Sequence, residues 1–276
     1  MRAGEIMRRM SVGIAVLGSA LALGLAQPTA PTTYENLDAV LWMQTAVEYK
    51  ASAVQTYRLA QAALLQGLRD PHWTAAIEQT GDFGNLPPAV ILDLDETVIE
   101  NSAFQARMIT SPDGYSVAAW NKWMEEESAT LVPGAIDFLQ FAHANGVTPI
   151  YITNRTCDTS KADDPTVQVL RKLRVPLDSA PERIFCNPDS KSSDKTARRA
   201  MVAAKFRILL LFGDQLGDFV GIPADAANLE GREKLYEAYQ GLFGERWFQL
   251  PNPMYGSWEG AVGNKLQDKL KHLRQQ

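Results

Sequence analysis

Residues 89–97 read AVILDLDET, four apolar residues followed by two aspartates that one leucine separates. The apolar run shows no alternation with polar residues, which is typical of a strand covered on both faces. Similar runs follow at 147–152, 183–186 and 207–212, and segments with helix start and stop signals lie between them at 133–146, 166–173 and 194–205. Strands that alternate with helices predict a doubly wound α/β fold, a parallel sheet with helices on both faces.

The N-terminal part of the chain has the features of a secretory signal peptide. Three arginines precede an apolar run of 14 residues from Val12 to Leu25, and the small residue Ala26 follows. The alternative is a membrane anchor, but a bilayer span needs about 20 residues. The first cysteine is Cys157, so a lipid-modified cysteine is not expected at the junction. We therefore expect residues 1–26 to be removed and the mature chain to be periplasmic or secreted, without attachment to a membrane.

Composition narrows the class of protein. The chain has 27 Lys and Arg against 32 Asp and Glu, and no basic run stands out. Binding to a nucleic acid polymer is therefore not expected. Its 3 His and 2 Cys are too few for a His-rich or thiolate metal site. A hydrophobic fraction of 46% is enough for a folded core.

Polar residues stand at the ends of three predicted strands. They are Asp93 and Asp95 after the first, Thr153 and Asn154 after the second, and Asp214 and Asp218 after the third. The carboxyl ends of parallel strands meet at one edge of a sheet, so we expect these groups to converge there, joined by Lys195 from a neighbouring helix. Clustered carboxylates without His or Cys favour a hard cation such as Mg²⁺. A divalent cation, an ammonium and hydrogen-bond donors around one point suit a phosphoryl group.

Several segments match the motifs of a known family. ILDLDETVIEN at 91–101 and LLFGDQLGDF at 210–219 resemble the two signature halves of the class C acid phosphatases, which belong to the haloacid dehalogenase (HAD) type. Further matches are WNKW at 120–123, VPGA at 132–135, TNR at 153–155 and LPNPMYGSWEG at 250–260. The resemblance implies a HAD-like phosphatase domain in residues 27–276. We expect a smaller helical cap from about 34–80 and 102–130, and residues 34–69 as one long helix.

The same resemblance implies roles in catalysis for two aspartates. Asp93 is expected to attack phosphorus and to become an aspartyl phosphate. Asp95 is expected to protonate the leaving alkoxide and then to act as base for the water that cleaves the intermediate. A general acid must hold a proton, so we expect activity to be highest near pH ~5–6. The resemblance to acid phosphatases also implies an optimum below neutral pH.

Binding roles follow for the remaining residues. Mg²⁺ is expected to be held by Asp93, the main-chain carbonyl of Asp95, Asp214 and, through water, Asp218. Thr153 and Asn154 are expected to hold the phosphoryl oxygens, and Lys195 to neutralise their charge, with Lys191 as a weaker candidate. Trp120 and Tyr255 are expected to stack on the ring of the substrate, which favours 5′-nucleotides and aryl phosphates. Trp123 is expected in the core, and Phe104 stands where the family usually has Tyr.

Other functions stay open at this point. An exported protein that captures a nucleotide or haem without turnover is one alternative, although Asp95 would repel the phosphate of such a ligand. A HAD phosphatase with a narrower substrate, such as a sugar phosphate, is another. The sequence also leaves open whether Cys157 and Cys186 form a disulfide and whether the chain forms a homodimer.

Overall fold

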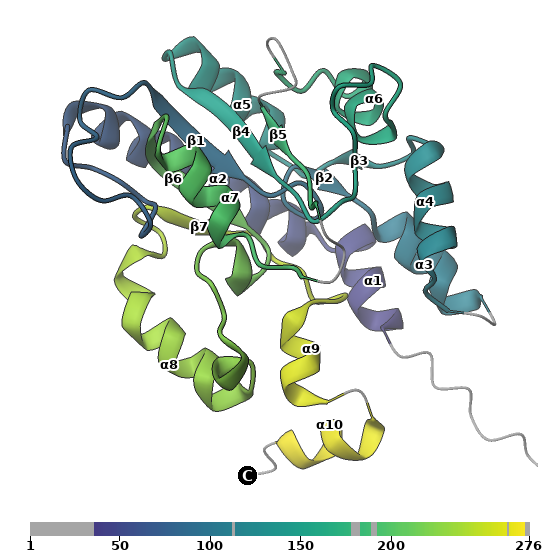
Figure 1. Cartoon of the computed structure of the whole chain (residues 1–276). Coiled ribbons are helices and arrows are strands. Elements are labelled where there is room, and N and C mark those ends of the chain that lie inside the picture. Colours follow the sequence, from purple (N-terminus) through teal and green to yellow (C-terminus); the bar gives the residue numbers. More distant parts are fainter. Residues whose placement is uncertain (1–35, 112–113, 178–182, 189–191, 264, 274–276) are drawn as a thin grey trace, which may run out of the picture. The chain divides into compact units, whose positions relative to one another are not determined.

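The computed structural model describes residues 36–111, 114–177, 183–188, 192–263 and 265–273, and the signal peptide expected at residues 1–26 lies outside them (Figure 1). The central feature is a five-stranded sheet in the order β5-β4-β1-β6-β7. Its strands are β1 (Pro88–Leu92), β4 (Thr148–Ile152), β5 (Ile184–Phe185), β6 (Arg207–Gly213) and β7 (Trp247–Gln249). All neighbours pair in parallel, which confirms the predicted α/β fold.

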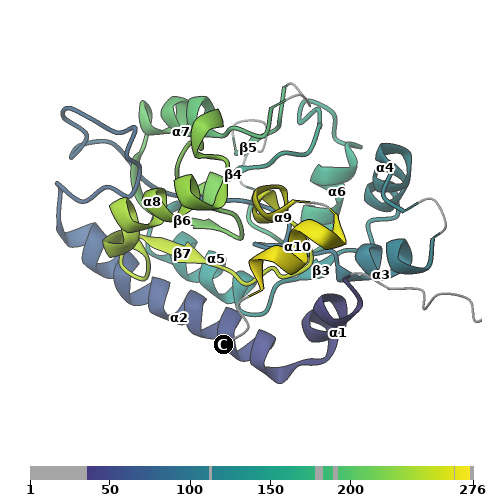
Figure 2. The same ribbon diagram turned by 90° about the horizontal axis from the view of Figure 1, so that it is seen from below.

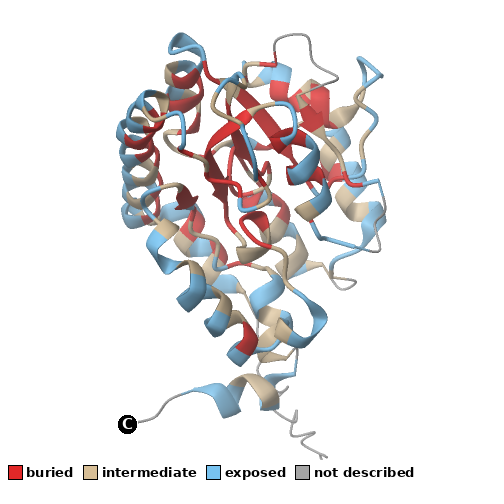
Figure 3. Ribbon diagram, turned by 60° about the vertical axis from the view of Figure 1, so that its left-hand side comes forward, coloured by how far each residue is buried: buried red, intermediate tan, exposed pale blue. Residues whose placement is uncertain are grey.

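Side chains of β1 alternate between two apolar cores, one on each face of the sheet. Val90 and Leu92 belong to the larger core, which also contains residues of α2 (Val47–Arg69), α5 (Ala135–Ala144) and α6 (Pro165–Lys172). Ala89 and Ile91 belong to the second core, against α7 (Thr196–Ala203) and α8 (Leu229–Tyr239). The sheet is therefore buried on both faces, as Figure 3 shows by its colour. Burial on both faces explains the unbroken apolar runs of the sequence.

The N-terminal helical stretch differs from the expected single helix. Ala46 adopts an extended conformation and separates α1 (Leu37–Thr45) from α2. The buried side chains of α2, which include Tyr57 and Leu64, face the sheet and α5, and Figure 2 shows α2 beside α5. Residues 47–69 therefore belong to a helical layer of the sheet rather than to a cap that begins near residue 34.

A smaller group of elements lies beside the carboxyl end of β1. It contains α1, α3 (Ser102–Thr110) and α4 (Val117–Glu125), with a two-stranded antiparallel sheet of β2 (Ile99–Glu100) and β3 (Thr130–Leu131) at its base. Helices α1 and α3 pack together, and α4 packs on α6. The part of the chain between β2 and β3 covers the second expected cap segment, residues 102–130, whose role as a cap stays a prediction.

Two short helices follow β7 near the end of the chain, α9 (Ser257–Val262) and α10 (Leu266–His272). A disulfide joins Cys157, after β4, to Cys186, after β5, with the Cα atoms 5.5 Å apart. This bond decides the question that the sequence left open. Within the described ranges, no helix has the length and apolar character that crossing a membrane requires.

Candidate active site

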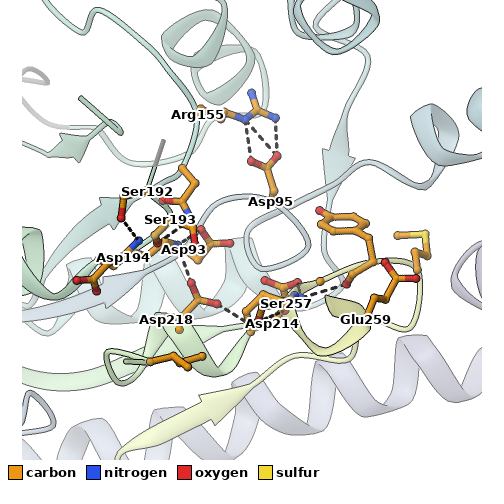
Figure 4. A pocket seen from close by; sticks show the side chains of 18 of the residues that line it. Asp93, Asp95, Arg155, Ser192, Ser193, Asp194, Asp214, Asp218, Ser257 and Glu259 are labelled. Atoms are coloured by element: carbon orange, nitrogen blue, oxygen red, sulfur yellow. Dashed lines mark hydrogen bonds and ion pairs between the residues drawn. The ribbon is translucent and has the colours of Figure 1, made fainter. Parts of the chain in front are cut away.

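A cavity of about 1000 Å³ opens at the carboxyl ends of the sheet strands. Its wall includes Asp93 and Asp95 after β1 and Asp214 and Asp218 after β6 (Figure 4). Asn154 after β4 also lines it. The crossover topology of a doubly wound sheet brings these loops to one edge. Of the polar groups expected there from the sequence, the four aspartates, Asn154 and Lys195 line the cavity, whereas Thr153 is buried and is not among its lining residues.

Three carboxylates form a tight cluster at the bottom of this cavity. Asp93, Asp214 and Asp218 are buried, and each offers an oxygen within 4.8 Å of the others. Gly213 makes this approach possible, because a Cβ atom at that position would lie 2.2 Å from the Cβ of Asp218. The glycine at the end of β6 is therefore required by the packing of the cluster.

Amide groups of the side chains and of the main chain fix two of these carboxylates. Asp214 Oδ2 accepts hydrogen bonds from Gln215 Nε2 at 2.8 Å and from Asn252 Nδ2 at 2.7 Å. Asp218 Oδ2 accepts from the Gln215 main-chain amide at 2.8 Å. The close spacing of one oxygen from each carboxylate suits oxygen coordination of a cation.

Lys195 lies directly before α7 and places its ammonium between two of the carboxylates. Nζ donates to Asp93 Oδ1 and, at 2.6 Å, to Asp218 Oδ1. Burial alone would lower the pKa of Lys195, but the Asp218 and Asp93 carboxylates outweigh it and raise this pKa above its usual value. Lys195 is therefore a permanent cation of the site.

One ammonium does not balance three buried carboxylates. Burial, opposed by Lys195 and reinforced by Asp218 and Asp95, raises the pKa of Asp93 to about 7. Burial, reinforced by Asp218 and Asp93, raises the pKa of Asp214 well above its usual range. The cluster has a deficit of positive charge that a divalent cation would remove. An all-oxygen donor set of this kind fits Mg²⁺ chemically.

The side chain of Asp95 lies apart from this cluster and contacts Arg155 (Figure 4). Arg155 Nε lies 3.1 Å from Oδ1 and 3.0 Å from Oδ2, and an Arg155 terminal nitrogen lies 2.7 Å from Oδ1. Asn101 Nδ2 donates to Oδ1 at 2.9 Å. The two aspartates of the motif are thus placed in different surroundings although one residue separates them.

The loop after β4 carries the expected phosphate-binding residues. Asn154 lines the cavity, and its Oδ1 accepts from Arg198 at 2.7 Å. Thr153 is buried, and its hydroxyl oxygen accepts from the Arg155 amide at 3.1 Å. Arg198 also donates to the Thr153 carbonyl. This arginine therefore fixes both the backbone of the loop and the orientation of the Asn154 amide.

Trp120 on α4 and Tyr255 after β7 line the same cavity. Phe104 is buried behind Trp120, with the ring centroids 5.1 Å apart in an edge-to-face arrangement. Trp123 is 2% exposed and donates from Nε1 to Asn101 at 2.9 Å. The placement of Trp123 in the core is therefore confirmed. The stacking roles of Trp120 and Tyr255 concern a substrate and stay predictions.

Five residues orient the groups named above, a role that was not predicted for them from the sequence, although the Arg155 guanidinium was expected at this edge: Asn101, Arg155, Arg198, Gln215 and Asn252. Four of them stand inside motifs already recognised, at 91–101, 153–155, 210–219 and 250–260, so their position was a usable signal. Arg198 lies on α7, outside any of the quoted motifs. Lys191, the weaker alternative to Lys195, lies outside the described residues.

Comparison with known proteins agrees with this geometry. Residues 22–258 match the family model described as HAD superfamily, subfamily IIIB (Acid phosphatase). The solved structure of a class C acid phosphatase from Bacillus anthracis is 34% identical, with a TM-score of 0.73, over 88% of this chain and 98% of that one. A structure of the class C acid phosphatase from the same organism with tungstate bound is 33% identical over the same shares, with a TM-score of 0.74.

Proposed function

This chain belongs to the HAD-superfamily acid phosphatases of subfamily IIIB and is a phosphoric monoester hydrolase, and we propose that it hydrolyses 5′-nucleotides and aryl phosphates with Mg²⁺ as cofactor. One observation carries this proposal. Asp93, Asp214, Asp218 and Lys195 converge at the sheet edge, while Asp95 stands apart in contact with a guanidinium. Such a division separates the carboxylate proposed to attack phosphorus from the carboxyl group proposed to transfer the proton.

The first half of the reaction uses both aspartates. An Asp93 oxygen forms a bond to phosphorus while the ester P–O bond breaks, and the electron pair of that bond stays on the leaving oxygen. Asp95 donates its proton to this oxygen, so an alcohol leaves and Asp95 becomes a carboxylate. In the second half, Asp95 removes a proton from water, the oxygen attacks phosphorus, and the Asp93–phosphorus bond breaks to release orthophosphate.

Asp93, Asp214 and Asp218, with the Asp95 carbonyl, are the groups proposed to hold Mg²⁺. When bound, the cation supplies positive charge to the phosphoryl oxygens and to the carboxylates around them. Lys195 contributes a further positive charge that does not depend on the cation. Charge placed around the phosphoryl group is the main source of acceleration in phosphoryl transfer, since one proton transfer supplies only about 10²–10⁴-fold.

Hydrogen bonds from Thr153 and Asn154 are proposed to orient the phosphoryl group. The Thr153 oxygen accepts from Arg155, which leaves its own proton to donate. The Asn154 amide nitrogen donates to the Ser193 carbonyl at 3.2 Å and retains a second proton. Because Arg198 holds Asn154 Oδ1, this amide presents its nitrogen rather than its oxygen to an anion.

Aromatic residues support the choice of substrate. Trp120 and Tyr255 line one cavity with the catalytic aspartates. Stacking on an aromatic side chain contributes about 1–3 kcal/mol per base and accepts many ring types. We propose nucleotides and aryl phosphates as a broad substrate class on this ground, and export of the chain on the signal-like segment at residues 1–26.

Phosphate release from 5′-AMP, nicotinamide mononucleotide, p-nitrophenyl phosphate and glucose 6-phosphate tests the proposal, at pH 5.5 with Mg²⁺ and then with EDTA. We expect EDTA-sensitive turnover that favours the three ring-bearing esters. A preference for glucose 6-phosphate would remove the stacking roles and favour a narrower sugar phosphatase. Tight nucleotide binding without turnover on any ester would favour a capture protein and contradict the proposed mechanism.

A further inference from the structure

The two oxygens of the Asp95 carboxylate accept different numbers of hydrogen bonds. Oδ1 accepts from Asn101 Nδ2 and from two nitrogens of Arg155, at 2.7–3.1 Å. Oδ2 accepts only from Arg155 Nε, at 3.0 Å, among the hydrogen bonds found in the described residues. Arg155 and Asn101 therefore hold Oδ1 from two sides, and Arg155 also contacts Oδ2.

Arg155 is held rigidly, which makes it suited to fix another side chain. Its side chain is 2% exposed, and its guanidinium lies 5.3 Å from the Trp120 ring centroid. Its amide donates to Thr153, and its carbonyl accepts from the Asn187 amide at 2.9 Å. Asn187 follows Cys186, which is bonded to Cys157. The backbone of Arg155 is thus anchored on both sides.

Asn101 is held with equal firmness on the opposite side of Asp95. The residue is fully buried, and its Oδ1 accepts from Trp123 Nε1 at 2.9 Å. This contact assigns Nδ2 as the atom that faces Asp95. Asp95 therefore lies between two fixed donors, one on the cap side and one on the loop after β4.

We propose that Arg155 is the positioning residue for the proton donor. Its guanidinium contacts both oxygens of Asp95 and thereby fixes the side chain to which the proposed function gives proton transfer to the leaving oxygen. The inference rests on the proposed function, in which Asp95 is the general acid. It adds that efficient protonation of the leaving group requires a guanidinium at residue 155, because a planar fork can contact both oxygens at once.

Esters with different leaving groups distinguish the positioning role of Arg155 from a merely structural role. The alkoxide of a ribose ester leaves poorly without a proton, whereas p-nitrophenolate is a stable anion that needs none. Formation of the aspartyl phosphate governs kcat/KM, so the later hydrolysis step, common to all substrates, does not obscure the comparison. A lost proton donor should therefore lower kcat/KM for 5′-AMP far more than for p-nitrophenyl phosphate.

The experiment compares kcat/KM for these two esters in R155M, R155K, D95N and the R155M/D95N double variant. We expect R155M to lower kcat/KM on the order of 10²-fold for 5′-AMP but within about fivefold for p-nitrophenyl phosphate. R155K should recover only part of the loss, because an ammonium lacks the fork. The double variant should be no worse on 5′-AMP than D95N, since Arg155 acts through Asp95.

Arg107 offers a matched control. Its guanidinium lies 4.9 Å from the Trp123 ring centroid and pairs with Glu126, and among the described residues it forms no hydrogen bond or ion pair with Asp95. R107M therefore removes an arginine stacked on a tryptophan of the same region and should leave the ratio between the two esters unchanged.

The outcomes distinguish the positioning role of Arg155 from the general-acid role of Asp95. Equal losses on both esters in R155M, with D95N selective for 5′-AMP, would overturn the role of Arg155 and leave the proposed function standing. A D95N variant without such selectivity would contradict the general-acid assignment itself. Circular dichroism monitors folding, and if R155M does not fold, the ratio in R155K decides: an unchanged ratio counts against the inference, and a selective loss supports it.

Discussion

Asp93 meets two opposing demands at the scale of a single residue. As nucleophile it must be ionised, yet burial raises its pKa to about 7 and Asp218 adds repulsion. We expect Asp93→Asn to abolish phosphate release while the fold is kept, because the amide relieves a desolvated charge. The melting temperature in EDTA should therefore fall by no more than a few degrees.

Asp163→Asn serves as control for this variant, since Asp163 is exposed and does not line the cavity. Turnover should be unchanged in the control. Measurable steady-state turnover by Asp93→Asn would remove the nucleophile assignment.

The raised carboxyl pKa values also predict how pH acts on the metal-free protein. Between about pH 4 and pH 7 the folded chain holds protons on Asp93 and Asp214 that the unfolded chain has released. Stability of the metal-free protein therefore falls as pH rises through this window. Mg²⁺ requires the ionised form, so its stabilising effect should grow in the same direction.

Thermal unfolding in EDTA and in excess Mg²⁺, recorded at pH 5, 6, 7 and 8, checks this expectation. The difference in melting temperature between the two conditions should widen with pH. A difference that stays constant over the series would contradict the raised pKa values.

Some contacts of the site could be predicted from the sequence and others could not. Asp93, Asp214 and Asp218 could be placed together because each follows an apolar strand, and strand ends share an edge. The Arg155–Asp95 contact could not be found in this way, because it joins positions 60 residues apart and depends on side-chain direction. The contact between Arg198 and Asn154 could not be predicted for the same reason, because it depends on how α7 packs beside the loop after β4.

At the scale of elements, the end of β6 is the most constrained segment of the site. Gly213→Ala would place a Cβ 2.2 Å from the Asp218 Cβ and 2.3 Å from its Oδ2. Asp218 must then move, so we expect weaker binding of Mg²⁺ and a loss of about 1–3 kcal/mol in stability from overpacking. The midpoint of activity against Mg²⁺ concentration and a denaturant titration measure the two effects.

Gly217, four residues later, provides the comparison. A Cβ there meets nothing within 4 Å, so Gly217→Ala should leave the Mg²⁺ midpoint in place. If both alanine variants shifted the midpoint equally, general sensitivity of the loop rather than contact with Asp218 would be responsible.

Strands could be predicted from the sequence where burial on both faces produces an unbroken apolar run. Strands β1, β4, β5 and β6 were expected within one or two residues because both faces are covered. The short β7, three residues at the edge beside β6, carries too little pattern to be recognised. The break at Ala46 lacks a Gly or Pro to mark it and depends on the packing of α1 against α3.

The disulfide acts at the scale of the whole molecule. Cys157 and Cys186 are 29 residues apart, and a crosslink over such a loop contributes about 3–4 kcal/mol by restricting the unfolded chain. We expect the C157S/C186S variant to lose about that much in a guanidinium titration. Wild type with a reductant should approach the variant, and a variant as stable as the oxidised wild type would contradict the estimate.

Three carboxylates and one ammonium give the Asp93, Asp214, Asp218 and Lys195 cluster a formal charge of −2. A divalent cation would bring that sum to zero, so the site would offer a phosphate dianion no net electrostatic attraction. Affinity for orthophosphate would then depend on directed hydrogen bonds, which reject a misplaced anion as readily as they accept a well-placed one. Neutrality of this kind favours rapid release of product and weak product inhibition.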